Sequence, residues 1–371
     1  MKIALFTHSL RSCWNHGNAH FLRGVLTALA DLGHEVEAWE PAQGWSVANL
    51  VRDHGVEGLA ASHAAWPTLT VNTWTGPHDL DLDRAVGASD LVIVHEWTEP
   101  WLVAALGQRR LTGRFTLLFH DTHHRAASDP TAIDALNLGA YDGVLAFGRS
   151  VAQLWAARGW GNRAFVWHEA ADTTLFRPPP ESVPRDGLVF IGNWGDEERN
   201  GELVDFLLEP AAQSGMRLDI HGVRYPQSAL DMLARTGARY RGWLPNARVP
   251  EAFARYVATV HVPRRLYVEQ LPGIPTIRVF EALACGIPLL SAPWDDCEAL
   301  FRPGRDFLLA RTPADMTRYM RAVASDAELR ATLASNGLES IRARHTCAHR
   351  ARELLAIVHE IAGRTEAVAC A

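Results

Sequence analysis

Short apolar runs alternate along the chain with longer segments whose apolar residues recur every three or four positions. The run at residues 2–6 predicts a buried strand, and the segment that follows predicts a helix because Phe21, Val25, Leu29 and Leu32 share one face before Gly33. Further strands are expected at 35–39, 91–94, 115–119, 143–147 and 164–167. This alternation is typical of an α/β protein with a parallel sheet.

A proline-rich segment interrupts the pattern at residues 177–184, which cannot be helical and favours an extended connector. The alternation then resumes, with strands expected at 187–191, 217–221, 258–262, 287–291 and 306–309, and residues 313–363 are helical in pattern. We therefore expect an N-terminal domain over 1–176, a linker over 177–186, a C-terminal domain over 187–345 and a terminal helix and tail over 346–371.

Composition narrows the class of protein. A chain of 371 residues exceeds the roughly 150 typical of one core, which favours two domains. The net charge of −6 argues against non-specific binding to DNA or RNA, which requires a basic face. The five cysteines are scattered without a Cys-x-x-Cys spacing, so we expect a reducing, cytoplasmic location. No stretch approaches the roughly 20 apolar residues of a membrane span. Oligomeric state and peripheral membrane association stay open.

The segment 271–291 carries the most informative chemistry. A loop rich in proline and glycine leads into a helix that opens near Thr276 and closes at Gly286. The unpaired N–H groups of such a helix start suit a diphosphate. Arg278 and Glu281 lie on one helix face, where the guanidinium suits a phosphate and the carboxylate suits ribose hydroxyls. The alternative is an ordinary α/β crossover in which the two form a surface ion pair.

The stretch Phe-Glu-Ala-Leu-Ala-Cys-Gly-Ile-Pro-Leu at 280–289 resembles the donor-site signature of GT-B glycosyltransferases. The continuation at 291–307 resembles the spore-maturation-type, glycosyltransferase group 1-like family, and segments 168–178, 190–201, 218–222 and 240–245 are similar to it as well. The resemblance implies an α/β GT-B fold of two Rossmann-like domains that face a central cleft. It also implies a C-terminal helix that crosses back to the N-terminal domain.

The resemblance also implies where the nucleotide-sugar donor binds. Glu281 would hold the ribose, and basic residues would neutralise the leaving phosphate, although Arg264 and Arg265 are equally read as solvated loop charges. Gly273 stands where many retaining relatives carry a second glutamate, so backbone amides of its loop would contact the sugar. The expected donor-binding residues are Gly17, Asn18, Asn193, Arg199, Trp243, Leu244, Arg264, Arg265, Gly273, Ile274, Thr276, Ile277, Arg278 and Glu281.

In the N-terminal domain, polar residues follow the predicted strands at their carboxyl ends, where ligands bind in open parallel sheets. The resemblance places His120 against the donor sugar. Asp121, His16 and Glu96 are candidates for a general base near the acceptor. His120 with His123 and His124 also offers ligands for zinc or manganese, but the nucleotide-binding pattern requires no metal, and we expect no metal site.

The predicted function is therefore transfer of a sugar from a UDP- or GDP-sugar to an unidentified acceptor hydroxyl, with retention of configuration favoured by the resemblance. The acceptor class stays open among glycan, lipid, protein, natural product and nucleobase, and no tightly bound cofactor is expected. A phosphorylase is disfavoured because Lys2 is the only conspicuous lysine for pyridoxal phosphate. Two alternatives remain: a nucleotide-sugar epimerase on the same fold, and a non-catalytic nucleotide-sugar-binding partner protein.

Overall fold

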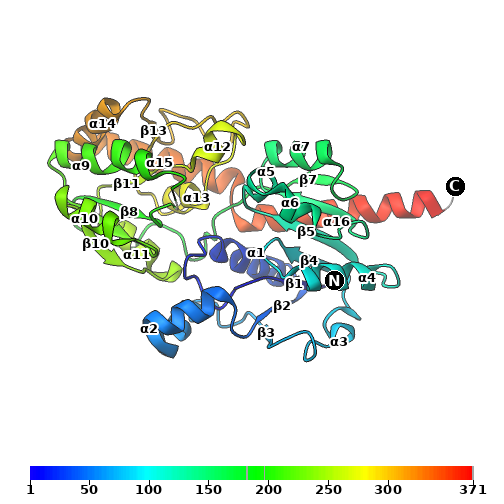
Figure 1. Cartoon of the computed structure of the whole chain (residues 1–371). Coiled ribbons are helices and arrows are strands. Elements are labelled where there is room, and N and C mark those ends of the chain that lie inside the picture. Colours follow the sequence, from blue (N-terminus) through cyan, green and yellow to red (C-terminus); the bar gives the residue numbers. More distant parts are fainter. Residues whose placement is uncertain (181–182, 196, 370–371) are drawn as a thin grey trace. The chain divides into compact units, whose positions relative to one another are not determined.

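The computed structural model describes residues 1–180, 183–195 and 197–369 and divides into two compact units (Figure 1). Unit 1 comprises Met1–Glu169 and Cys347–Ala371, and unit 2 comprises Ala170–Thr346. The first boundary between the units, after Glu169, thus lies before the predicted domain boundary at 176. The proline-rich segment belongs to unit 2. Residues 181 and 182 of the predicted linker and residues 370 and 371 of the predicted tail lie outside the described residues.

Unit 1 is built on a parallel sheet of seven strands in the order β3-β2-β1-β4-β5-β6-β7. The strands are β1 (Lys2–Phe6), β2 (Glu35–Pro41), β3 (Val71–Trp74), β4 (Leu91–His95), β5 (Thr116–Asp121), β6 (Gly143–Ala146) and β7 (Ala164–Val166). The central strands β1, β4 and β5 are almost wholly buried, as expected for a sheet covered by helices on both faces. Their carboxyl ends therefore meet at one edge, where His95 pairs in register with His120.

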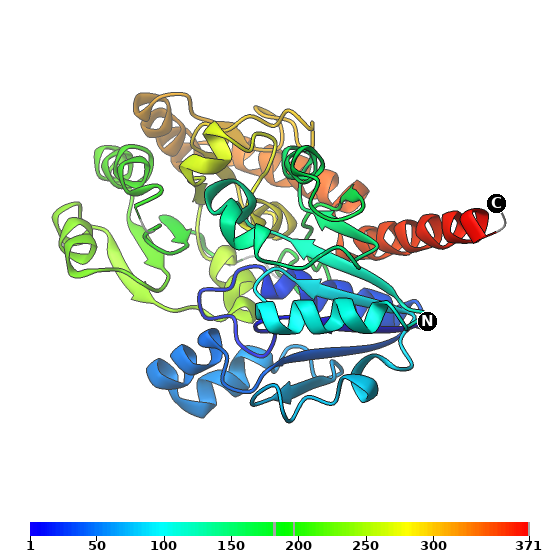
Figure 2. The same cartoon turned by 45° about the vertical axis from the view of Figure 1, so that its right-hand side comes forward.

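The helices of unit 1 include the one that ends the chain. They are α1 (Ala19–Asp31), α2 (Trp45–His63), α3 (Leu82–Val86), α4 (Pro100–Arg110), α5 (Arg125–Ser128), α6 (Pro130–Asp134), α7 (Arg149–Arg158) and α16 (Cys347–Ala369). The last helix, α16, packs against α1 (Figures 1 and 2), and the indole of Trp167 donates to the carbonyl of Arg350 at 2.9 Å. The predicted return of the C-terminal helix to the N-terminal domain is confirmed.

Unit 2 contains a second parallel sheet, of six strands in the order β10-β9-β8-β11-β12-β13. The strands are β8 (Leu188–Ile191), β9 (Leu218–His221), β10 (Arg239–Gly242), β11 (Ala258–His261), β12 (Leu289–Ser291) and β13 (Leu308–Leu309). The apolar side chains of β8, β9 and β11 form one core with the helices around them. The prediction of two Rossmann-like domains is confirmed.

Short helices dominate unit 2 until its last two. They are α8 (Asn200–Leu203), η1 (Val204–Leu208), α9 (Glu209–Ser214), α10 (Gln227–Arg235), η2 (Asn246–Arg248), α11 (Val249–Ala254), α12 (Arg265–Glu269), α13 (Ile277–Ala284), α14 (Pro313–Ser325) and α15 (Ala327–Arg344). Among the helices that the structure describes, none has both the length and the apolar character needed to cross a membrane.

The two strands that the apolar pattern did not predict are β3 and β10. Both lie at sheet edges, and neither is an apolar run: β3 reads Val-Asn-Thr-Trp, and β10 reads Arg-Tyr-Arg-Gly with three exposed residues. Their sequences therefore lack the hydrophobic signal by which the apolar edge strands β7 and β13 were predicted.

Candidate functional site

In unit 2, the candidate donor site begins at helix α13. This helix lies in the connection from β11 to β12. Thr276 is its N-cap, and seven of its eight residues are buried. The amide of Val279 donates to the carbonyl of Thr276 at 3.0 Å, whereas the amides of Ile277 and Arg278 at the start of the helix are available to an anion. Arg278 forms an ion pair with Glu281, whose side chain is fully buried, so the pair is not the surface contact of the alternative interpretation.

A second basic group, Arg199, lies just before α8. Its guanidinium donates to the carbonyl of Val262 at 2.8 Å and to the carbonyl and amide oxygens of Asn193 at 2.9 and 3.0 Å. Burial lowers the pKa of Arg199 to about 10, and the neighbouring positive charges of Arg264 and Arg278 act in the same direction. A buried cation whose hydrogen-bond acceptors are neutral is stabilised by a nearby anion. This location is therefore suited to a phosphate group.

The two arginines that follow β11 differ in their surroundings. Arg264 is largely buried and forms an ion pair with Glu198. Arg265 is half exposed, and its Nε lies 3.0 Å from Glu202 Oε1, which fits a solvated ion pair. We call Arg199, Arg264 and Arg278 the arginine cluster, because the first of them is within electrostatic range of the other two.

Gly273, which replaces the glutamate of many retaining relatives, occupies a position that only glycine fits. Its φ is 89°, and a Cβ there would lie 2.8 Å from Cys297 Sγ and 2.9 Å from Glu298 Cγ. Its amide donates to the carbonyl of Asp295 at 2.8 Å, so the amide is engaged within the protein. Ile274 beside it is buried. The loop before α13 is therefore shaped by the segment 295–298.

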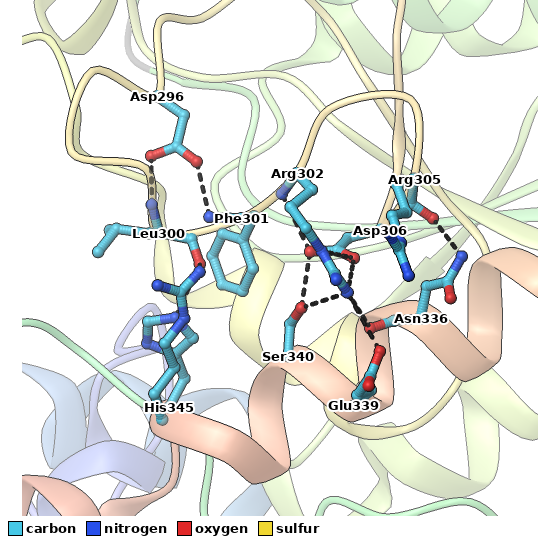
Figure 3. Close-up of polar contacts among 11 residues, drawn as sticks. Asp296, Leu300, Phe301, Arg302, Arg305, Asp306, Asn336, Glu339, Ser340 and His345 are labelled. Atoms are coloured by element: carbon cyan, nitrogen blue, oxygen red, sulfur yellow. Dashed lines mark hydrogen bonds and ion pairs between the residues drawn. The ribbon is translucent and has the colours of Figure 1, made fainter.

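The segment behind Gly273 is itself fixed to α15, as Figure 3 shows. The carboxylate of Asp296 accepts the amides of Leu300 and Phe301 at 3.0 and 2.7 Å. Further along, Arg302 pairs with the buried Asp306 at 2.8 Å, and Ser340 on α15 donates to the same carboxylate at 2.8 Å. These contacts hold the connection between β12 and β13 as a rigid support for the loop at Gly273.

The remaining residues predicted for the donor lie at the carboxyl ends of other strands. Asn193 follows β8 and contacts Arg199, so the structure brings these two together. Trp243 and Leu244 are half-buried in the loop after β10, which is separated from β8 by β9. The structure thus gathers Asn193, the arginine cluster and Glu281 in one region, with Trp243 and Leu244 farther along the same edge of the sheet.

In unit 1, the predicted acid–base residues meet at the carboxyl edge. Glu96 and Asp121 are both buried, and burial raises the pKa of Glu96 well above its usual range, with the charge of Asp121 adding to the effect. Asp121 accepts the indole N–H of Trp155 at 2.6 Å and the amide of His123 at 3.2 Å. Burial raises the pKa of Asp121 as well, so both carboxyl groups favour the protonated form more than an exposed carboxyl group does.

The two predicted histidines are buried and neutral. Burial lowers the pKa of His120 to about 3, and its ring lies between Trp167, 4.8 Å away, and Phe21, 6.0 Å away. Burial also lowers the pKa of His16 well below its usual range. A base with such a pKa accepts protons poorly at neutral pH, so Glu96 is better matched to proton transfer than either histidine.

Gly17 and Asn18 lie in the loop that opens α1, where Asn18 is the N-cap residue. Both side-chain amide atoms of Asn18 are buried, and within the described chain neither has a hydrogen-bond partner. A buried amide without partners is costly, and a bound ligand would remove that cost.

Sequence reasoning missed one histidine at this edge, His8, and did not connect it with His95. His8 lies just after β1 and His95 ends β4, and both rings are near His16. The histidines come together because β1 pairs with β4, and this pairing cannot be read from the order of the elements along the chain.

The comparisons with known proteins bear on both units. Residues 199–356 match the model of a family described as glycosyl transferase-like. The match covers fewer than half of the residues of the chain. The matched segment contains the arginine cluster, α13 and the connection from β12 to β13. No curated protein matches the chain in sequence at a significant level.

Solved structures share the fold across almost the whole chain. HepE from Anabaena, crystallised with UDP and glucose, has a TM-score of 0.69 at 14% identity, covering 97% of this chain and 100% of HepE. Sucrose-phosphate synthase from Thermosynechococcus elongatus has a TM-score of 0.66 at 15% identity, covering 98% and 100%. The DNA-modifying enzyme β-glucosyltransferase, studied with uridine diphosphoglucose, has a TM-score of 0.62 at 13% identity, covering 97% and 99%. The chain therefore has the GT-B fold of glycosyltransferases.

Proposed function

We propose that this chain is a glycosyltransferase that moves a sugar from a UDP-sugar to an acceptor hydroxyl. The observation that carries the proposal is the arginine cluster beside Glu281 at the start of α13, inside the family-matched segment. Structures that share the fold were solved with UDP or UDP-glucose, which favours uridine over guanosine as the donor base.

The arginine cluster accounts for stabilisation of the leaving group. As the bond from the sugar to the diphosphate breaks, negative charge grows on the phosphate oxygens. Arg199, Arg264 and the first-turn amides of α13 interact with that charge more strongly in the transition state than with the intact donor. Arg278 pairs with the buried carboxylate of Glu281 and so positions it to accept hydrogen bonds from the ribose.

Proton transfer from the acceptor distinguishes two stereochemical outcomes. We propose retention, because segment 280–289 resembles retaining relatives, and then the leaving phosphate takes the acceptor proton. An inverting reaction would instead need Glu96 or Asp121 in its deprotonated form as the base. The anomeric configuration of the product, read from its NMR coupling constant, decides between the two: inversion would contradict the proposal of retention.

Thermal unfolding with UDP, GDP, ADP and TDP tests the donor assignment. A ligand that binds only the folded protein stabilises it by about 2.7 kcal/mol at a concentration of 100 Kd. We expect UDP to raise Tm in the wild type and in Glu251→Gln, whose carboxylate is exposed, and not in Glu281→Gln. No shift with any diphosphate at millimolar concentration would overturn the assignment.

Acceptor-free incubation with UDP-glucose separates the rival functions. A transferase is expected to release UDP slowly by hydrolysis, because water replaces the acceptor. An epimerase would convert the sugar while it remains attached to UDP, and a non-catalytic binding protein would return the donor unchanged. Either of these last two results would replace the proposed activity.

A further inference from the structure

Three histidines converge at the carboxyl edge of the sheet in unit 1. His8 and His16 come from the loop between β1 and α1, and His95 is the last residue of β4, the neighbour of β1. The ring centroid of His8 lies 4.2 Å from that of His16 and 5.3 Å from that of His95. We call His8, His16 and His95 the histidine cluster.

The histidine cluster presents nitrogen atoms that the protein leaves unused. Nδ1 of His8 and both ring nitrogens of His16 are buried and form no hydrogen bond of ordinary geometry with any residue the structure describes. A buried polar atom without a partner costs roughly 1–3 kcal/mol. A neutral imidazole has one N–H and one lone pair, so His8 and His16 can each offer one lone pair to a ligand at this place.

The third histidine is oriented by its neighbours. The hydroxyl of Thr122 lies 2.9 Å from Glu96 Oε1, to which it donates, and 3.2 Å from Nε2 of His95. Because the single hydroxyl proton points to Glu96, Nε2 of His95 carries a proton that it donates to Thr122. Nδ1 then keeps its lone pair, which among the described residues accepts a long contact of 3.4 Å from the amide of Trp97. Metal-binding histidines are commonly fixed by such a partner on the second nitrogen.

The distances fit a metal ion better than packing alone. One nitrogen of each ring lies within 4.8 Å of the corresponding atoms of the other two. Ligands 2.0–2.1 Å from a tetrahedral ion lie about 3.4 Å apart, which small side-chain rotations would bring about. Three imidazoles suit Zn²⁺ or a similar first-row ion and leave a fourth position for water or a hydroxyl group.

We propose that His8, His16 and His95 bind one divalent transition-metal ion, with Zn²⁺ the expected occupant. The set differs from the triplet of His120, His123 and His124 considered from the sequence, because the sheet brings His95 to the β1 loop. The inference uses only unit 1 and does not depend on the proposed nucleotide-sugar donor.

Titration of chelator-treated, full-length protein with Zn²⁺ alone tests the proposal. Calorimetry is expected to show one equivalent bound to the wild type and to His78→Ala, whose exposed imidazole is a matched control. In His16→Ala the affinity is expected to fall at least about tenfold, because one of three ligands is lost. Equal affinity in His16→Ala and the wild type, or no binding to the wild type at micromolar Zn²⁺, would overturn the site.

A measurement on the wild type covers the case in which His16→Ala fails to fold. X-ray absorption at the zinc edge is expected to show three imidazole nitrogens at about 2.0–2.1 Å in protein loaded with one equivalent. One or two imidazoles, or a sulfur ligand, would assign the ion to another place and overturn the proposal. Glu281→Gln is expected to bind Zn²⁺ like the wild type, so failure of the donor site and failure of the metal site are distinguishable.

Discussion

Position 273 shows how one residue determines the shape of the loop before α13. The backbone there has φ of 89°, a conformation that side chains other than glycine rarely adopt, and Cys297 and Glu298 occupy the space of a Cβ. The departure from the family pattern at Gly273 is thus built into the packing of the loop. A glutamate could not be restored at this position without moving the segment 295–298.

Gly273→Ala is expected to destabilise the protein more than Gly304→Ala. Both glycines have positive φ, which costs about 1–2 kcal/mol for a residue with a Cβ. Only at 273 would the new methyl group also collide with neighbours, since nothing lies within 4 Å at 304. Urea unfolding measures the difference, and equal losses in the two variants would show that the loop is not closely packed.

The raised pKa of Glu96 predicts how the stability of the protein depends on pH. Its pKa is raised in the folded protein, so above about pH 4.5 the unfolded chain loses this proton while the folded protein keeps it. The contribution of Glu96 to the free energy of unfolding therefore decreases as pH rises toward the pKa of Glu96 in the folded protein. The decrease is up to about 1.4 kcal/mol per pH unit. We expect Tm of Glu96→Gln, measured from pH 5 upward, to fall less steeply than that of the wild type. Parallel curves would contradict the buried, protonated state.

At the scale of elements, the strength of the hydrophobic signal decided what the sequence revealed. The strands with buried apolar runs and helix α13, bounded by Thr276 and Gly286, were predictable from local pattern. Edge strands β3 and β10 were not, because neither is an apolar run. The juxtaposition of Arg278 and Glu281 was predictable because the two are close in sequence on one helix. The histidine cluster was not, because it depends on which strands pair.

The support behind Gly273 is expected to depend on one buried carboxylate. Asp306→Asn breaks the pair with Arg302 and weakens the bond from Ser340, which is expected to cost about 2–4 kcal/mol. Glu339→Gln removes the exposed partner of the same arginine at 3.4 Å and is expected to cost less than about 1 kcal/mol. Guanidinium unfolding compares the two variants, and a loss in Asp306→Asn as small as that in Glu339→Gln would contradict this role.

For the whole molecule, the notable feature is that the chain leaves unit 1 at Glu169 and returns to it at Cys347. Unit 1 is therefore complete only after unit 2 has been made. The returning helix α16 buries Ala351 and Leu354 and packs against α1.

Truncating a buried leucine on α16 tests whether the returning helix is part of the core of unit 1. Leu354→Ala is expected to cost about 2–5 kcal/mol, since the side chain is fully buried. Leu355→Ala, at a half-buried neighbouring position, is expected to cost clearly less. Equal and small losses in thermal unfolding would show that α16 contributes little to unit 1.

Calorimetric titration with UDP tests the central claim most directly. The wild type and Arg248→Gln, which removes an exposed arginine of unit 2, are expected to bind one UDP with equal affinity. Arg278→Gln removes one member of the arginine cluster and the partner of Glu281, and is expected to bind at least about tenfold more weakly, with circular dichroism confirming that it is folded. Unchanged affinity in a folded Arg278→Gln, or no binding of UDP to the wild type, would contradict a nucleotide-sugar site at α13.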